Sequence, residues 1–252
     1  MELVFDWQYL LLLFLLGNLA GFINVMAGGG SVLILPLLLF MGLDASVANG
    51  TNRIAIFALT LSAITSMKRE NVSDFKLSWK MAAFTLPGAI IGAILAQDIS
   101  NELFKTILAW VMIGILFMII LPKSKKRFLI DKLKHYPKII YPVMIAIGFY
   151  GGFIQVGVGF LLMLGIQSIL DLSLLKVNMH KVFIVFVYTI PALAIFIFQG
   201  NVNLILGLVL ASGMGLGAWW SAKVAIKKGD GIIRLFLILS IILISMKLFN
   251  IY

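Results

Sequence analysis

Cysteine is absent from this 252-residue chain, and charged residues make up only 12% of it. The missing thiols exclude disulfides, thiolate nucleophiles and thiolate metal sites. So few charges cannot cover a soluble domain, and the longest polar stretch is residues 123–138. No lysine or arginine precedes the first hydrophobic run, so we expect no cleaved signal peptide.

The chain is instead rich in apolar residues. Hydrophobic residues make up 62% of the sequence, in runs that reach the roughly 18–20 residues of a membrane span. This predicts an all-α polytopic membrane protein. The net charge of +10 does not indicate nucleic-acid binding, because the basic residues lie in loops between hydrophobic segments. The predicted segments are 8–43, 46–67, 77–97, 103–122, 139–170, 173–199, 202–226 and 231–250.

The first segment contains the run Gly28, Gly29, Gly30 and Ser31. Each glycine in a helix interior costs about 1 kcal/mol relative to alanine, and the segment is too long for one crossing. Backbone that leaves a helix at membrane depth must line a cavity or be buried in protein. The run therefore predicts a broken helix. A weaker form of the pattern, Gly157 and Gly159, predicts a second break in the fifth segment.

The two halves of the chain resemble each other in order. Residues 21–25 resemble 152–156, and Arg53 aligns with His180, next to Lys181. All strong basic clusters fall on one side only if each long segment enters the membrane and returns. This predicts two inverted repeats, each with one broken re-entrant helix and three spanning helices. The predicted units are residues 1–122, a basic cytoplasmic linker at 123–138, and residues 139–252.

The ionisable residues inside the segments are cationic, whereas Asp and Glu lie at segment ends and in loops. Buried cations are costly in a membrane and usually functional, and a helix N-terminus after a break attracts anions. Structural alternatives are helix packing for the glycines, snorkelling for Arg53 and Lys181, and a packing role for His180. No catalytic residue, metal ligand or cofactor is predicted. The predicted substrate-binding residues are Asn24, Gly28, Gly29, Gly30, Ser31, Thr51, Asn52, Arg53, Gln155, Gly157, Gly159, Asn178, His180 and Lys181.

The pattern from Asn24 through Ser31, followed by Pro36, Gly42 and residues 48–52, resembles the TauE/SafE family, a sulfite-exporter-like group also called toluene sulfonate uptake permeases. The resemblance covers about residues 10–250, and its second copy departs from the family at Phe160. It implies a multi-pass inner-membrane carrier of sulfur-containing or organic anions.

These features predict a secondary transporter, expected to be an exporter, of sulfite, sulfonates or related organic acids by alternating access. It is predicted to be no enzyme, to lie in the inner (plasma) membrane, and to have a small anion and the lipid bilayer as partners. A monomer and a homodimer both stay open. One alternative is a membrane scaffold without transport. Another is an intramembrane hydrolase using Ser31 and His180, which lacks the Gly-x-Ser-x-Gly context and an orienting carboxylate.

Overall fold

The structure is a computed structural model that describes residues 7–70, 75–120, 137–233 and 235–236. Within these ranges the chain is helical and has no strand, which confirms the all-α prediction for this part. The predicted linker and the last hydrophobic segment lie largely outside the described residues. The elements are α1 (Trp7–Ala27), α2 (Ser31–Phe40), α3 (Ala45–Arg69), α4 (Lys76–Leu95), α5 (Asn101–Ile120), η1 (Pro137–Ile139), α7 (Ile140–Phe153), α8 (Val158–Leu170), α9 (Leu174–Phe198) and α10 (Leu204–Lys228).

Both long hydrophobic segments are interrupted where the glycines predict a break. α1 ends at Ala27 and α2 begins at Ser31, with Gly28 between them at a φ of 85°. The α7–α8 connection contains Gln155 and Gly157 at φ of 67° and 71°. Positive φ suits glycine and is uncommon for other residues. The two predicted breaks are therefore confirmed.

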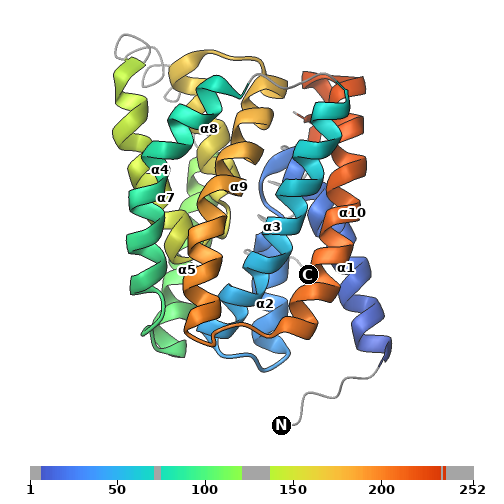
Figure 1. Ribbon diagram of the computed structural model, residues 1–252, viewed down its shortest axis with the longest axis vertical. Coiled ribbons are helices and arrows are strands. Elements are labelled where there is room, and N and C mark those ends of the chain that lie inside the picture. The colour runs from blue at the N-terminus through green and yellow to red at the C-terminus, as the bar shows by residue number, and fades with distance from the viewer. Residues whose placement is uncertain (1–6, 71–74, 121–136, 234, 237–252) are drawn as a thin grey trace.

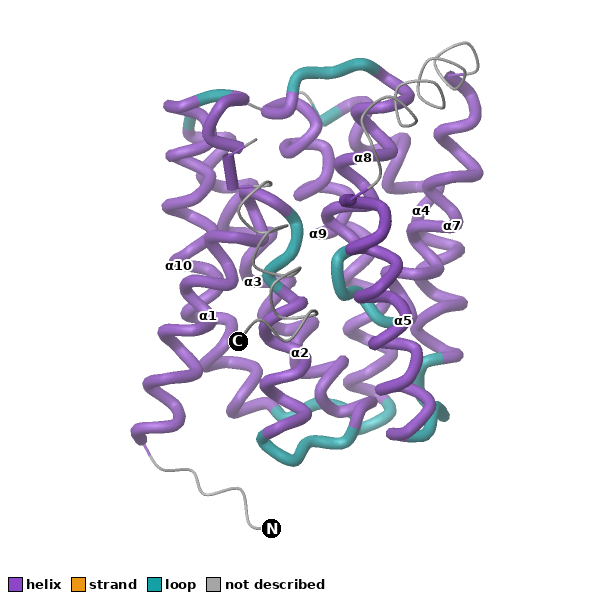
Figure 2. Tube along the Cα trace, turned by 180° about the vertical axis from the view of Figure 1, so that it is seen from behind, coloured by secondary structure: helices purple, strands orange, loops and turns teal. Residues whose placement is uncertain are grey.

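The chain reverses direction at each break. α1 runs parallel to α10, because Asn18 packs against Gly217 and the Phe22 carbonyl accepts a hydrogen bond from Ser221. α2 then returns to the end where α1 began and leads into α3 (Figure 1). α7 runs parallel to α4 from the opposite end, and α8 returns to that end. Figure 2 shows both connections inside the bundle, away from its two ends.

Glycines bring these parallel helices into backbone contact. A methyl group on Gly213 or Gly217 of α10 would collide with carbonyl oxygens of α1. Gly88 and Gly92 of α4 face carbonyl oxygens of α7 in the same way. Small residues at such crossings are typical of helices that pack in lipid. These four glycines therefore serve helix packing.

Four helices of the described chain, α1, α4, α9 and α10, are long and apolar enough to cross a membrane. α2, α7 and α8 are shorter apolar helices. α3 is as long as α9 but more polar, since it buries Asn49, Asn52 and Arg53. α3 and α9 pack against each other near the centre of the molecule (Figure 1), and the site described below is built between them and the two breaks.

Candidate functional site

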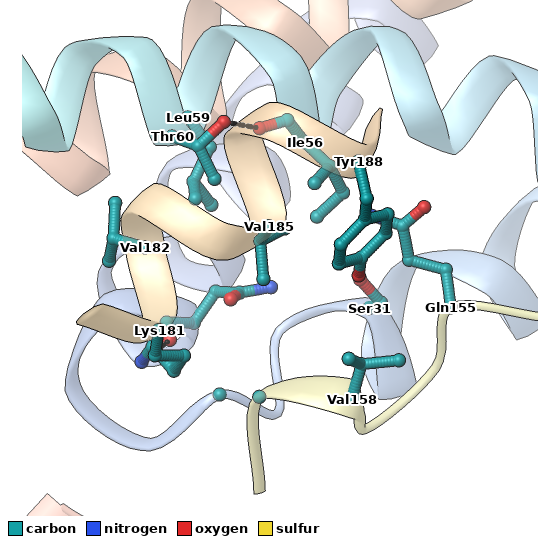
Figure 3. Close-up of a pocket in the computed structure, with 13 residues that line it drawn as sticks. Ser31, Ile56, Leu59, Thr60, Gln155, Val158, Lys181, Val182, Val185 and Tyr188 are labelled. Carbon is teal, nitrogen blue, oxygen red and sulfur yellow. Dashed lines mark hydrogen bonds between the residues drawn. The ribbon is translucent and has the colours of Figure 1, made fainter. Parts of the chain in front are cut away.

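The two helix breaks meet each other inside the bundle. Gly28 of the first break lies so close to Gly159, at the start of α8, that a methyl group on either would collide with the other's backbone. A cavity lies beside this contact (Figure 3). Its lining residues are Asn24, Gly28, Ser31, Ile56, Leu59, Thr60, Gln155, Val158, Gly159, Lys181, Val182, Val185 and Tyr188.

The cavity is small and its polar lining is rich in hydrogen-bond donors. The volume of the cavity that the centres of water-sized molecules can occupy is about 20 Å³. One water needs about 10–15 Å³ on this measure, so the cavity in this conformation holds about one or two waters. Among the described residues that line it, Lys181 is the only charged one and none is a carboxylate. Ser31, Gln155 and Tyr188 add hydroxyl and amide groups.

Lys181 of α9 binds the end of α1. Its Nζ donates hydrogen bonds to the carbonyl oxygens of Asn24 at 3.0 Å and Val25 at 2.8 Å. The last four carbonyls of a helix have no partner within that helix, and inside a membrane they must find another donor. The side chain is buried, at 1% exposure. Lys181 therefore terminates α1 while its ammonium group borders the cavity.

Arg53 of α3 makes the corresponding contacts with the end of α7. Its Nη1 donates to Gln155 Oε1 at 2.7 Å and to the Gly151 carbonyl at 3.2 Å, and its Nη2 donates to the Gly152 carbonyl. The guanidinium also lies over the Phe196 ring, 4.6 Å from its centroid. Arg53 is fully buried but does not line the cavity. Each central helix thus supplies a cation to the broken helix of the other half of the chain.

Comparison with known proteins identifies the class of molecule that carries these paired breaks. The family model for the sulfite exporter TauE/SafE matches residues 13–248. The chain belongs to the TauE/SafE family. It is thus a transmembrane transporter of that family, and a multi-pass membrane protein.

Three curated relatives of this TauE/SafE transporter are named as probable membrane transporters, and each match covers most of both chains. "Probable membrane transporter protein" of Haemophilus influenzae is 27% identical over 95% of this chain and 94% of its own length. "Probable membrane transporter protein ORF9" of Sinorhizobium sp is 30% identical over 96% of this chain and 93% of its own length. "Probable membrane transporter protein YfcA" of Escherichia coli K12 is 29% identical over 94% of this chain and 88% of its own length. No solved structure matches the chain significantly.

Six of the predicted site residues of the TauE/SafE transporter line the cavity. Gly29 and Gly30 instead pack beside it, against the Phe160 ring and the Ala20 carbonyl. Thr51 accepts a hydrogen bond from the Asn203 backbone N–H at 2.9 Å, at the start of α10. The lining residues are Asn24, Gly28, Ser31, Gln155, Gly159 and Lys181, and those outside the lining are Gly29, Gly30, Thr51, Asn52, Arg53, Gly157, Asn178 and His180.

His180 faces α4 and not the cavity. Its Nδ1 lies 2.7 Å from Ser78 Oγ in a hydrogen bond. Ser31, the serine of the hydrolase alternative, lines the cavity, whereas His180 does not. The arrangement of the TauE/SafE transporter therefore gives no support to a serine–histidine pair, and the transporter names of the relatives agree with this.

Two polar lining residues, Tyr188 and Thr60, were missed by the sequence reasoning. Both lie in hydrophobic segments where neither charge nor glycine marks them. The Tyr188 hydroxyl is buried and has no hydrogen-bond partner among the described residues. Tyr188 lies seven residues, about two helical turns, after Lys181 on α9, and this spacing is the one sequence signal that places it on the same helix face.

Proposed function

We propose that this chain is a secondary transporter that exports small anions, with sulfite, sulfonates and related organic acids as the substrate class, across the inner membrane. The observation that carries the proposal is the cavity between the two breaks, whose described lining comprises one cation, several neutral donors and no carboxylate. A cation or proton site would instead require acidic ligands. The family membership supports transport as the activity.

The proposal includes two inverted repeats, residues 1–122 and 139–252, joined by a cytoplasmic linker at 123–138. The helix pair α1–α2 starts and ends at one end of the bundle, and the pair α7–α8 at the other, which supports this relation. The reciprocal contacts of Arg53 and Lys181 support it further. Rocking of one repeat against the other would open the cavity to each side in turn.

The distribution of charge at the two ends supports an orientation in the membrane. Lys68 and Arg69 end α3, and Lys227 and Lys228 end α10 at the same end of the bundle. The basic end is then cytoplasmic by the positive-inside rule. The other end carries Asp44 and Asp98 and faces outward. α2 and α8 are re-entrant in this arrangement.

In the proposed mechanism the anion binds against Lys181 and the donors around it. The anion competes with the carbonyls of Asn24 and Val25 for the ammonium group, so binding loosens the contact between α9 and α1. Because the cavity in this conformation is smaller than a sulfonate, loading also requires the breaks to separate. A phosphate-binding loop for ATP is not found in the sequence, so an ion or substrate gradient would drive transport.

The test is uptake of radiolabelled sulfite and sulfoacetate by proteoliposomes that contain the purified chain. Lys181→Gln keeps a hydrogen-bond donor for the α1 carbonyls but removes the charge, and should lower transport at least about 10-fold, the equivalent of about 1.4 kcal/mol. The matched control is Lys223→Gln, an exposed lysine of α10 that packs on Trp219. It should transport like the wild type. A wild-type chain that moves no anion of a broad panel overturns the proposal.

A further inference from the structure

Two buried asparagines of the central helices take part in none of the hydrogen bonds described above. Asn52 of α3 and Asn178 of α9 are both at 0% exposure. Neither the Oδ1 nor the Nδ2 atom of either side chain has a hydrogen-bond partner within the described part of the chain. Buried polar groups are nearly always paired in folded proteins, and an exception calls for an explanation such as a ligand or water.

Both asparagines lie on the helix faces that line the cavity. On α3 the lining residues are Ile56, Leu59 and Thr60, and Asn52 lies one turn before them. At about 100° per residue, Asn52 points within about 35° of the mean direction of that stripe. On α9 the lining residues begin at Lys181, and Asn178 lies about one turn before them and points in a similar direction. Each amide therefore continues the lining by one turn.

The two amides extend the lining in opposite directions. α3 begins at the end of the bundle that carries Asp44, so Asn52 lies between the cavity and that end. α9 begins at the opposite end, where the Leu174 backbone N–H binds Asp230, so Asn178 lies between the cavity and the basic end. One helical turn is about 5.4 Å, so each amide lies about that far along its helix from the nearest lining residues.

We propose that Asn52 and Asn178 are transfer positions for the anion, one on each side of the central cavity. Each carboxamide donates N–H groups to anion oxygens as the substrate enters or leaves. Because the amide is neutral, it binds the anion less tightly than Lys181 and lets it pass on. The inference rests on the proposed transport function and adds the route to it.

The experiment measures the KM for radiolabelled sulfite on each face separately, in right-side-out and inverted membrane vesicles. Leucine has nearly the shape of asparagine and no donor. Asn52→Leu should raise the KM about 10-fold on the Asp44 face and less than 2-fold on the basic face, and Asn178→Leu should do the reverse. Asn18→Leu, a half-buried asparagine of α1 away from the cavity, is the control and should leave both values unchanged.

Melting of the purified variants separates a transport role from a structural one. Since neither amide has a hydrogen-bond partner to lose among the described residues, both leucine variants should melt at or above the wild-type temperature. Wild-type KM values on both faces, equal rises on both faces, or a lowered melting temperature would each overturn the inference. A wild-type chain that transports no anion would overturn the proposed function itself, which is a different result from active variants with unchanged KM.

Discussion

At the scale of residues, buried cations satisfy the helix ends that the breaks create. A helix that stops inside the bundle leaves carbonyl oxygens without intrahelical partners. Lys181 donates to those of α1 and Arg53 to those of α7. Only Lys181 also lines the cavity. We therefore expect two residues with similar contacts to differ in function, Arg53 holding the fold and Lys181 binding the anion.

Replacing Arg53 by methionine should lower the free energy of unfolding by about 2–4 kcal/mol. The carbonyls of Gly151 and Gly152 lose their buried donors, and an unsatisfied buried group costs about 1–3 kcal/mol. Thermal unfolding of the purified protein in detergent measures the loss. Arg69→Met is the control, because Arg69 is exposed at the end of α3 and stacks on the Trp219 ring, and its change should stay within about 1 kcal/mol. Wild-type melting of Arg53→Met together with lost transport would contradict the structural role.

Part of the site was predictable from residue type alone. A buried cation is rare in a membrane segment, and this selected Lys181, which lines the cavity, together with Arg53 and His180, which do not. The alignment of Arg53 with His180 did not reveal that Arg53 and Lys181 make corresponding contacts. Those contacts join residues about a hundred or more positions apart and depend on how α3 and α9 pack. Tyr188 was missed because a tyrosine in an apolar helix is ordinary, and its spacing of seven residues from Lys181 is the one sequence feature that points to it.

At the scale of elements, the fold depends on two broken helices that touch through their backbones. The contact is possible because Gly28 and Gly159 lack side chains. The glycine run predicted the breaks, since glycine disfavours a helix interior. The contact between the breaks was not predictable, because no pattern within one half specifies which residue of the other half it meets.

Gly159→Ala should separate the two breaks and lower transport at least about 10-fold. The added methyl would collide with the backbone of Gly28, which cannot yield as a flexible side chain does. Overpacking of this kind costs about 1–3 kcal/mol. Vesicle transport and melting temperature are both measured. Gly215→Ala in α10 is the matched control, because its nearest neighbour would be 3.9 Å away. Wild-type transport by Gly159→Ala would mean that the contact is not needed.

At the scale of the whole molecule, the order of hydrophobic segments predicted most helices because burial in lipid requires long apolar helices. Seven of the eight predicted segments correspond to described helices, two of them as broken pairs. The lengths of α2 and α8 and the parallel packing of α1 on α10 required the structure. The charges at the two ends of the bundle then predict which end faces the cytoplasm.

Single cysteines at the two ends should be labelled from opposite sides of the membrane. The native chain contains no cysteine, so Asp98→Cys and Lys228→Cys each introduce a unique thiol at an exposed position. If the basic end is cytoplasmic, a membrane-impermeant maleimide should label Asp98→Cys in intact cells and Lys228→Cys only after the membrane is opened. Labelling of both from one side is incompatible with α4 and α10 crossing the membrane together, since Asp98 follows α4 and Lys228 ends α10. The reverse pattern would keep the fold and invert its orientation, which would contradict the positive-inside assignment.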